Sequence, residues 1–414
     1  MDKIEFEGYK YIDGGVCAAA GFKANGLNCG YNPDKNKNDL CLVASDVICN
    51  TAGVFTQNKV KGAPVIVCQE HLKATAGKAR AIIANSKNAN TCNADGLKKA
   101  EAMCDLAGNA LNIDSKEVLV ASTGVIGQVI KIEPVEEHIE ELVEGLSYDG
   151  NAKAANAIMT TDTVPKEVAV EFEIGGKVCH LGGMGKGSGM IHPNMATTLN
   201  FVTTDVAISS EMLKQALTET VKITYNCLSI DGDQSTNDTL IVMANGLCDN
   251  EEITAEGDDY EIFKKALYIV MMNITKMLAR DGEGATKMIE CTCKGAESLD
   301  TAITVAKSVI CSPLFKCAMF GEDANWGRIL CAIGYADAEF DIDKIDLDIS
   351  SKTGTLEVCR NGAGVEFSED FAKEVLKEEE IYININLNQG NVSAKAWGCD
   401  LTYDYVKING DYRS

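Results

Sequence analysis

The chain has 414 residues and carries 38 basic against 61 acidic side chains, which gives a net charge of −23. With 46% hydrophobic and 24% charged residues, its composition is that of a folded globular protein, long enough for one large α/β unit or two domains. So strong a negative charge disfavours nucleic acid and anionic membrane surfaces, and we expect neither as a partner.

Strand-like and helical periodicities alternate along the chain. Runs of four to seven residues predict strands, which are 41–44, 117–120, 168–172, 239–243 and 381–387. Apolar stripes at helical spacing predict helices, which are 97–107, 139–146, 213–221 and 262–278. Ser209 or Ser210 is expected to cap the third helix, and the fourth is apolar on most sides, as a buried helix would be. The mixture predicts an α/β (α+β) protein.

Seventeen cysteines are present, but no C-x-x-C pair and no spacing typical of zinc ligands. The first residues are acidic and lack the apolar segment of a secretory signal. We therefore expect a cytoplasmic protein whose thiols, including Cys92 and Cys179, are mostly small core residues, with no metal and no resident cofactor.

The glycine-rich stretch 182–190 is the main anomaly of composition. A phosphate loop needs Gly where His180 stands and Ser or Thr where Gly187 stands, so that motif is excluded. We interpret the stretch as a tight, flexible loop in which Lys186 presents one cation to a carboxylate.

Residues 231–239 read DGDQSTNDT and resemble the start of a calcium loop. Its sixth position is Thr236 rather than Gly, and Val242 replaces the final Glu. A rigid polar turn before a buried strand, or support for a nearby site, is the preferred interpretation.

Candidates for nucleophilic chemistry are hydroxyls, because only four histidines are present. Ser188 lacks the flanking glycines of a nucleophile elbow. The segment STGVIG at 122–127 follows a predicted strand, where backbone N–H groups can face an oxyanion. Thr197 precedes a strand, where threonine is common, and composition alone does not single it out.

Taken together and in this order, nine motifs resemble the ornithine acetyltransferase family, the bifunctional glutamate N-acetyltransferases of arginine biosynthesis. They span nearly the whole chain: AGVFT (52–56), STGVIG (122–127), MTTDT (159–163), KGSGMI (186–191), PNMAT (193–197), DGDQSTNDT (231–239), GEGATK (282–287), FGEDANWGR (320–328) and YDYVKIN (403–409).

The resemblance implies layered sheets sandwiched by helices, an N-terminal-nucleophile-like enzyme with a smaller C-terminal domain. It also implies that the precursor cleaves itself between Ala196 and Thr197. The products would be an alpha chain, residues 1–196, and a beta chain, residues 197–414, with two copies of each in a heterotetramer. The new N-terminal Thr197 would then use its own α-amine as general base, which explains why no catalytic histidine is needed.

The implied reaction is ping-pong transfer of acetyl from N2-acetylornithine to glutamate through an acetyl-threonine. The family's catalytic residues correspond here to Thr197, with Thr123 and Gly124 holding the oxyanion. Substrate contacts carried over by motif are Thr160, Lys186, Thr197, Glu283, Asn409 and Ser414. Acetyl-coenzyme A as a second acetyl donor stays open.

The main alternative is an N-terminal-nucleophile aminopeptidase or amidohydrolase, which would use water as the acceptor. An acidic, non-enzymatic scaffold is the other alternative. The chain departs from residues frequent in the family at Lys87, Thr198, Gln234 and Ser414, none of which removes a proposed catalytic group. His192, beside the proposed cleavage segment, is interpreted as structural.

Overall fold

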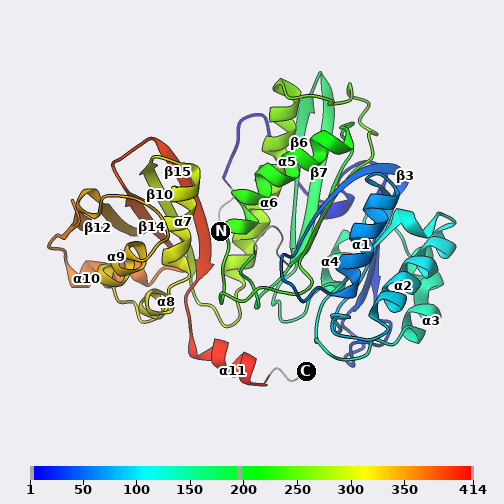
Figure 1. Cartoon of the computed structure of the whole chain (residues 1–414), viewed down its shortest axis with the longest axis horizontal. Helices are drawn as coiled ribbons and strands as arrows, with labels where there is room; N and C mark the ends of the chain where they lie inside the picture. The colour runs from blue at the N-terminus through cyan, green and yellow to red at the C-terminus, as the bar shows by residue number, and fades with distance from the viewer. Residues whose placement is uncertain (1–3, 194–197, 412–414) are drawn as a thin grey trace.

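The computed structural model describes residues 4–193 and 198–411. Within them, the strands form two sheets of nine and six strands, each accompanied by helices (Figure 1). The larger sheet contains β1 (Lys10–Ile12), β2 (Phe22–Leu27), β3 (Leu40–Phe55), β4 (Lys78–Asn85), β5 (Val118–Ser122), β6 (Lys166–Ile174), β7 (Lys177–Lys186), β8 (Leu199–Thr204) and β9 (Thr239–Ala244). The smaller sheet contains β10 (Met288–Ala296), β11 (Asp346–Ser351), β12 (Gly354–Arg360), β13 (Ala363–Gly364), β14 (Glu380–Asn386) and β15 (Val392–Cys399).

The described helices lie between and around these strands. They are α1 (Ala63–Ala74), α2 (Gly96–Leu111), α3 (Glu133–Glu144), α4 (Asn151–Ala157), α5 (Ser210–Lys222), α6 (Asp258–Arg280), α7 (Leu299–Ile310), α8 (Pro313–Phe320), α9 (Trp326–Gly334), α10 (Glu369–Leu376) and α11 (Tyr403–Asp411). Short 3-10 helices are η1 (Gly15–Cys17), η2 (Ser115–Glu117), η3 (Tyr225–Cys227) and η4 (Ile342–Lys344). The predicted α/β class, with sheets, covering helices and a smaller C-terminal unit, is confirmed.

The larger sheet has the strand order β1-β6-β7-β8-β9-β3-β4-β5, with β2 paired to β3. Neighbouring strands are antiparallel except for the parallel pairs β8–β9 and β4–β5. Strands β8 and β9 thus lie in the middle of the sheet, flanked by β7 on one side and β3 on the other. Both begin at the end of the sheet where β7 finishes, because β7 runs antiparallel to β8.

Two hydrophobic cores lie on the two faces of this sheet. In β8, Phe201 belongs to the core shared with α1 to α4, whereas Val202 belongs to the core shared with α5 and α6. Ile241 and Val242 of β9 divide in the same way. A strand covered on both faces needs apolar residues at successive positions, which is why 239–243 reads as a continuous apolar run.

Helix α6 is the predicted buried helix, and it is buried because it lies between the two sheets. It packs on β6 and β7 of the larger sheet and on β10 and β15 of the smaller one. Its Lys276 Nζ lies 3.4 Å from the buried Glu290 of β10. The other predicted helices correspond to α2, α3 and α5, and Ser209 is the cap of α5, since its hydroxyl accepts the N–H of Met212.

The loop interpretation of the glycine-rich stretch was wrong for residues 182–186, whereas residues 187–190 lie outside any helix or strand. Residues 182–186 belong to β7, in register with both β6 and β8. A Cβ on Gly182 would lie 1.9 Å from the carbonyl oxygen of Gly15 in η1. The glycines are there because neighbouring backbone and side chains press against the strand, which a side chain would prevent.

Cysteines follow the expected pattern except for three, Cys92, Cys317 and Cys331, which are exposed. All seventeen are free, and most are buried or partly buried, so the prediction of core thiols is confirmed in the main. Cys92 is exposed, contrary to expectation. It lies in the connection between β4 and α2 with a left-handed φ of 62°, and this turn places its side chain at the surface.

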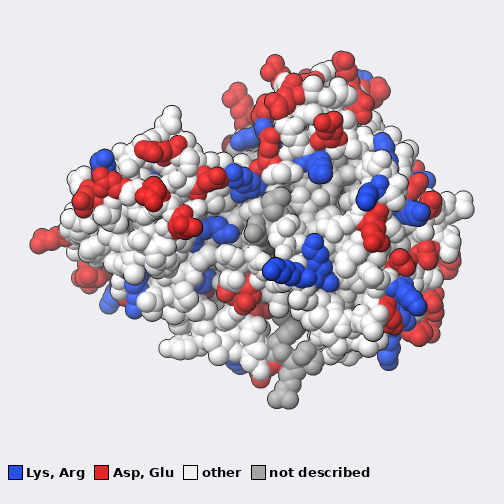
Figure 2. Space-filling model, in the orientation of Figure 1, with Lys and Arg blue, Asp and Glu red and all other residues white. Residues whose placement is uncertain are grey.

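The acidic charge is distributed over the surface. Figure 2 shows carboxylates spread over the upper and outer parts of one face, with lysines and arginines between them. Among the described residues, no single helix meets the length and hydropathy of a membrane span. The bent pair α7 and α8, which meet at 57°, meets them jointly by length and composition only.

Candidate active site

A polar pocket lies at the end of the larger sheet where β7 ends and β8 and β9 begin. Its volume is about 120 Å³. Segments from distant parts of the chain line it: Ala89, Thr123, Gly124, Ile126, Thr160, Thr161, Lys186, Gly189, Met190, Thr198, Leu199, Ser235, Thr236, Asn237, Asp238, Glu283 and Asn409. A pocket of this size, lined by hydroxyls, amides and a few charges, suits a small polar molecule.

The turn after β5 brings Thr123 and Gly124 to the pocket. The Thr123 N–H donates to the carbonyl of Asn85 at 3.0 Å, and the Val125 N–H donates to Lys87 at 3.1 Å. Among the residues that the structure describes, the Gly124 N–H between them has no hydrogen-bond partner, so it is available to a ligand. Gly124 has a φ of 132°, and a Cβ there would lie 2.2 Å from the Lys87 carbonyl carbon. Only glycine permits this turn.

Lys186 ends β7 and is buried in the wall of the pocket. Its side chain is enclosed, with 7% of the residue exposed, and its Nζ donates to Thr123 Oγ1 at 3.2 Å. Burial lowers the pKa of Lys186, while the nearby carboxylates of Asp162, Asp238 and Glu283 act in the opposite direction. The ammonium is therefore placed where an incoming anionic group would find a partly desolvated cation.

Asp162 is buried beside the pocket and holds two segments of its wall by hydrogen bonds. Its Oδ1 accepts the Gly187 N–H at 2.6 Å and the Lys166 ammonium at 2.7 Å, and its Oδ2 accepts the Thr160 N–H at 3.0 Å. Burial alone would raise the pKa of Asp162, but the charges of Lys186 and Lys166 lower it to about 2. This permanently ionised carboxylate fixes the backbone of both Thr160 and the segment after Lys186.

Glu283 and Asn409 form another part of the pocket wall. Asn409 Nδ2 donates to Glu283 Oε2 at 2.7 Å, and the Glu283 N–H donates to the Ser188 carbonyl at 2.9 Å. Gly189 lets this wall close, because a Cβ there would lie 2.3 Å from Glu283 Oε2. A carboxylate held in this way can bind a substrate ammonium group.

The polar turn 231–239 supports the start of β8, as one of the two interpretations of its sequence proposed. Asn237 Nδ2 donates to the carbonyls of Ala89 at 2.5 Å and Ser122 at 2.9 Å. Asp238 Oδ1 accepts the Thr198 N–H at 2.6 Å. These bonds tie the turn after β5 and the residue after the proposed nucleophile to one rigid loop.

Asp238 is the pocket residue that sequence reasoning missed. It is fully enclosed, and burial raises its pKa to about 7, against the lowering effects of the Thr198 N–H and Lys186. A buried acid in a pocket whose pKa is shifted toward neutral pH is a candidate functional group. The sequence signal was present, since Asp238 directly precedes the buried β9, but its burial followed only from the packing.

The structure brings together six of the predicted site residues, although no observation tests their roles, which stay predictions. Thr123, Gly124, Thr160, Lys186, Glu283 and Asn409 all line the one pocket. Ala196, Thr197 and Ser414 lie outside the described residues, but Thr198 lines the pocket. His192 is not among its lining residues. Its Nδ1 lies 3.0 Å from Ser229 Oγ, and burial lowers its pKa to about 4, which suits a structural role.

The fold and pocket define a class of protein: an α/β protein with a polar pocket that suits a small, charged molecule. Residues 23–414 match the model of the ArgJ family. The chain is 50% identical over 394 residues to "Arginine biosynthesis bifunctional protein ArgJ 1" of Clostridium acetobutylicum, covering 95% of this chain and 96% of that protein. It is 48% identical over 404 residues to the ArgJ protein of Caldanaerobacter subterraneus subsp. tengcongensis, covering 97% and 99%.

A crystal structure of the arginine biosynthesis bifunctional protein ArgJ from Bacillus halodurans is 46% identical, with a TM-score of 0.49, over 51% of this chain and 98% of that one. The chain belongs to the ArgJ family. The resemblance predicted from the sequence is confirmed, and so are the acetyltransferase class and the arginine-biosynthesis function that it implied.

Proposed function

We propose that this chain is a self-cleaving acetyltransferase that moves acetyl from N2-acetylornithine to glutamate, with Thr197 as the nucleophile. The observation that supports it best is the shared pocket: six residues predicted separately, between positions 123 and 409, meet there beside Thr198. Membership of the ArgJ family supports the same reaction class.

Self-cleavage before Thr197 fits the topology of the larger sheet. The proposed bond lies in the connection between β7 and β8, which are antiparallel neighbours. A cut there breaks no strand, and it leaves the new N-terminus one residue before Thr198, which lines the pocket. The division into residues 1–196 and 197–414 therefore follows a connection in the sheet rather than a boundary between the two sheets.

The proposed reaction has two acyl-transfer steps. The Thr197 hydroxyl, deprotonated by its α-amine, attacks the acetyl carbonyl, and the amide nitrogen of ornithine leaves with a proton. Glutamate's amine then attacks the acetyl ester and releases the Thr197 hydroxyl. Each tetrahedral intermediate carries an oxyanion, and the Gly124 N–H and the Thr123 hydroxyl are the donors proposed to stabilise it.

Lys186 and Glu283 are proposed to orient the substrates. The buried ammonium of Lys186 suits the carboxylate that acetylornithine and glutamate share. Glu283, hydrogen-bonded to Asn409, suits the cationic side chain of ornithine. Thr160 is fixed by Asp162 at the same pocket and contributes a hydroxyl. No resident cofactor is needed for these steps, and acetyl-coenzyme A is proposed as an additional acetyl donor.

The proposed assembly is a heterotetramer of two alpha and two beta chains in the cytoplasm. An N-terminal-nucleophile amidohydrolase would share the cleavage but would transfer acetyl to water. The difference is measurable: loss of acetylornithine should require glutamate in the transferase and be independent of it in the hydrolase.

The primary test is denaturing mass spectrometry of the purified protein. The wild type should give two fragments that divide before Thr197, and Thr197→Ala should give one full-length chain without transferase activity. Thr198→Ala is the matched control, since it removes the neighbouring hydroxyl, and it should still be cut. An uncut wild-type chain that nevertheless transfers acetyl to glutamate would overturn the proposed nucleophile.

A further inference from the structure

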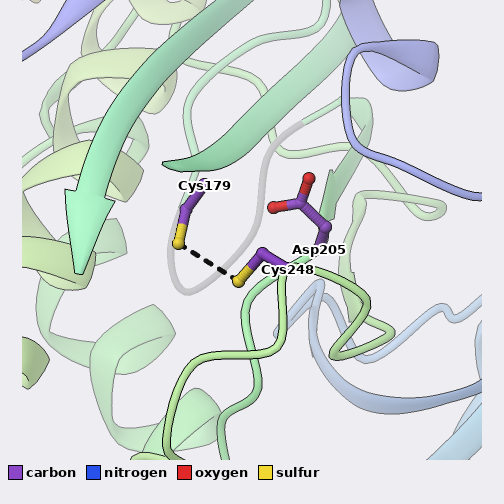
Figure 3. A group of neighbouring side chains, drawn as sticks. All are labelled: Cys179, Asp205 and Cys248. Atoms are coloured by element: carbon purple, nitrogen blue, oxygen red, sulfur yellow. Dashed lines mark hydrogen bonds between the residues drawn. The ribbon is translucent and has the colours of Figure 1, made fainter. Parts of the chain in front are cut away.

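Two cysteines meet at the far end of β7 from the pocket. Cys179 lies on β7, and Cys248 lies in the segment after β9. Their sulfur atoms point at each other and are 3.1 Å apart, with Asp205 beside them (Figure 3). Cys179 is buried and Cys248 partly exposed. The pair plays no part in the proposed chemistry, because seven residues of strand, roughly 23 Å, separate Cys179 from Lys186.

We propose that Cys179 and Cys248 are a thiol modification site: they form a reversible Cys179–Cys248 disulfide by exchange with a low-molecular-weight disulfide such as oxidised glutathione. A disulfide bond is about 2.05 Å long, so the sulfurs need to approach by only about 1 Å. Cys248 is the thiol that an oxidant can reach, whereas Cys179 is enclosed and can resolve the intermediate.

Of the two thiols, Cys248 has its pKa lowered and Cys179 has its pKa raised; the Cys248 thiol also donates to Asn250 Oδ1 at 2.9 Å. The hydrogen bond from Cys179 lowers the pKa of Cys248, although burial and the nearby Asp205 oppose this. The same bond raises the pKa of Cys179. The partner that remains a thiol donates to the partner that becomes a thiolate, and a partly exposed thiolate is the reactive species in disulfide exchange.

The reaction balances in two steps. The Cys248 thiolate attacks one sulfur of the small disulfide, forms a mixed disulfide and releases one small thiolate. Cys179 then loses its proton, attacks the Cys248 sulfur and releases the second small thiolate. The two protein thiols lose two electrons and two protons, and the small disulfide is reduced to two thiols.

A metal site is the other chemistry that this group of residues suggests. Cys179, Cys248 and Asp205 offer ligand atoms within 4.8 Å of one another. Two thiolates on tetrahedral zinc, at about 2.3 Å each, lie about 3.8 Å apart, farther than these sulfurs. The Asp205 carboxylate is also engaged: it accepts the Ala20 N–H at 3.1 Å, the His180 N–H at 2.7 Å and the His180 imidazole at 2.8 Å. The geometry therefore favours the disulfide.

If the chain is cut before Thr197, the cross-link would join two separate chains; this consequence rests on the proposed function. Cys179 then belongs to the alpha chain and Cys248 to the beta chain. The disulfide would join the two chains covalently, far from the pocket, so acetyl transfer should continue in the oxidised enzyme.

The test treats the full-length purified enzyme with oxidised glutathione and then blocks free thiols with iodoacetamide. On a denaturing gel, the two fragments should migrate as one species without reductant and as two after dithiothreitol. Cys248→Ser and Cys179→Ala should each abolish the joined species. Cys92→Ser and Cys331→Ser, which remove exposed thiols, should retain it.

Peptide mapping makes the outcome independent of cleavage. A linked peptide pair containing Cys179 and Cys248 supports the proposal even in an uncut chain. Two outcomes overturn it: both cysteines fully alkylated after oxidation in a folded enzyme, or stoichiometric zinc that is released when the two thiols are modified. Failure of the chain to cleave would instead appear as a single band with and without reductant.

Discussion

Asp238 and Lys186 are charged groups enclosed in the same pocket, and burial shifts both toward their neutral forms. The charged form of Lys186 is stabilised by the carboxylates of Asp162, Asp238 and Glu283. The charged form of Asp238 is stabilised mainly by the Thr198 N–H and Lys186. Removing a charge from water is costly unless neighbours compensate, so the proton affinity of each group reports its surroundings. No histidine is among the described residues that line this pocket, and burial raises the pKa of Asp238 to about 7, in the range of an imidazole.

The pH dependence of the folding stability of Asp238→Asn tests whether burial raises the pKa of Asp238. The pKa of this acid is raised from 3.8 to about 7 in the fold. The neutral Asp238 carboxyl therefore contributes fully to folding stability below about pH 4. As the pH rises to about 7, the carboxyl ionises in the unfolded chain before it does in the folded one, and the folded state loses up to about 4 kcal/mol of stability. Relative to the parent chain, Asp238→Asn should become progressively more stable across that window. Urea unfolding in the uncut Thr197→Ala background measures it.

Asp337→Asn, the same change at an exposed position outside the pocket, is the control. The same Asp238→Asn change, made in the cleaving enzyme, should remove an ionisation near pH 7 from the profile of kcat for acetyl transfer. Profiles of identical shape in both enzymes would contradict a role for Asp238 in the reaction.

At the scale of elements, β7 shows how packing overrides composition. Its glycines suggested a flexible loop, yet the stretch to Lys186 is a regular central strand. The carbonyl of Gly15 packs against the face of β7 at Gly182, and β8 pairs along one edge of β7. The regular strand fixes the position of Lys186, because its end is held by two neighbours. A loop would not give a buried ammonium a defined place.

Gly182→Ala tests this interpretation of the strand. The new methyl would lie 1.9 Å from the Gly15 carbonyl oxygen, a backbone atom that cannot turn away. We expect a loss of about 1–3 kcal/mol in stability, measured as a lower thermal midpoint. Gly334→Ala, in α9 with open space around it, should be neutral or slightly stabilising. A midpoint unchanged in Gly182→Ala would contradict the close packing.

At the scale of the whole molecule, the larger sheet is built from both sides of the proposed cut. β8 and β9 lie between β7 and β3, which precede the cut in the chain. The smaller sheet and α7 to α11 follow it entirely (Figure 1). Two chains that share one sheet and its two cores cannot fold as independent domains.

The two chains should therefore stay together after cleavage. Separation requires breaking the β7–β8 and β3–β9 ladders and exposing both cores. We expect residues 1–196 and 197–414 to co-elute in size-exclusion chromatography and to separate only in denaturant. Residues 1–196 produced alone should be insoluble or bind hydrophobic dyes. A soluble, compact alpha chain would contradict the shared core.

The sequence by itself determined the family, the α/β class and the places of nine helices and strands, and it named six residues that line one pocket. It could do so because strands, helices and motifs are local patterns, set by periodicity and by residue type. Only the tertiary structure decided that 182–186 is a strand, that Asp238 is enclosed so that burial raises its pKa, and that Cys179 meets Cys248. Each of these depends on which distant segment removes water from a given side chain, and that contact is not written in any local pattern.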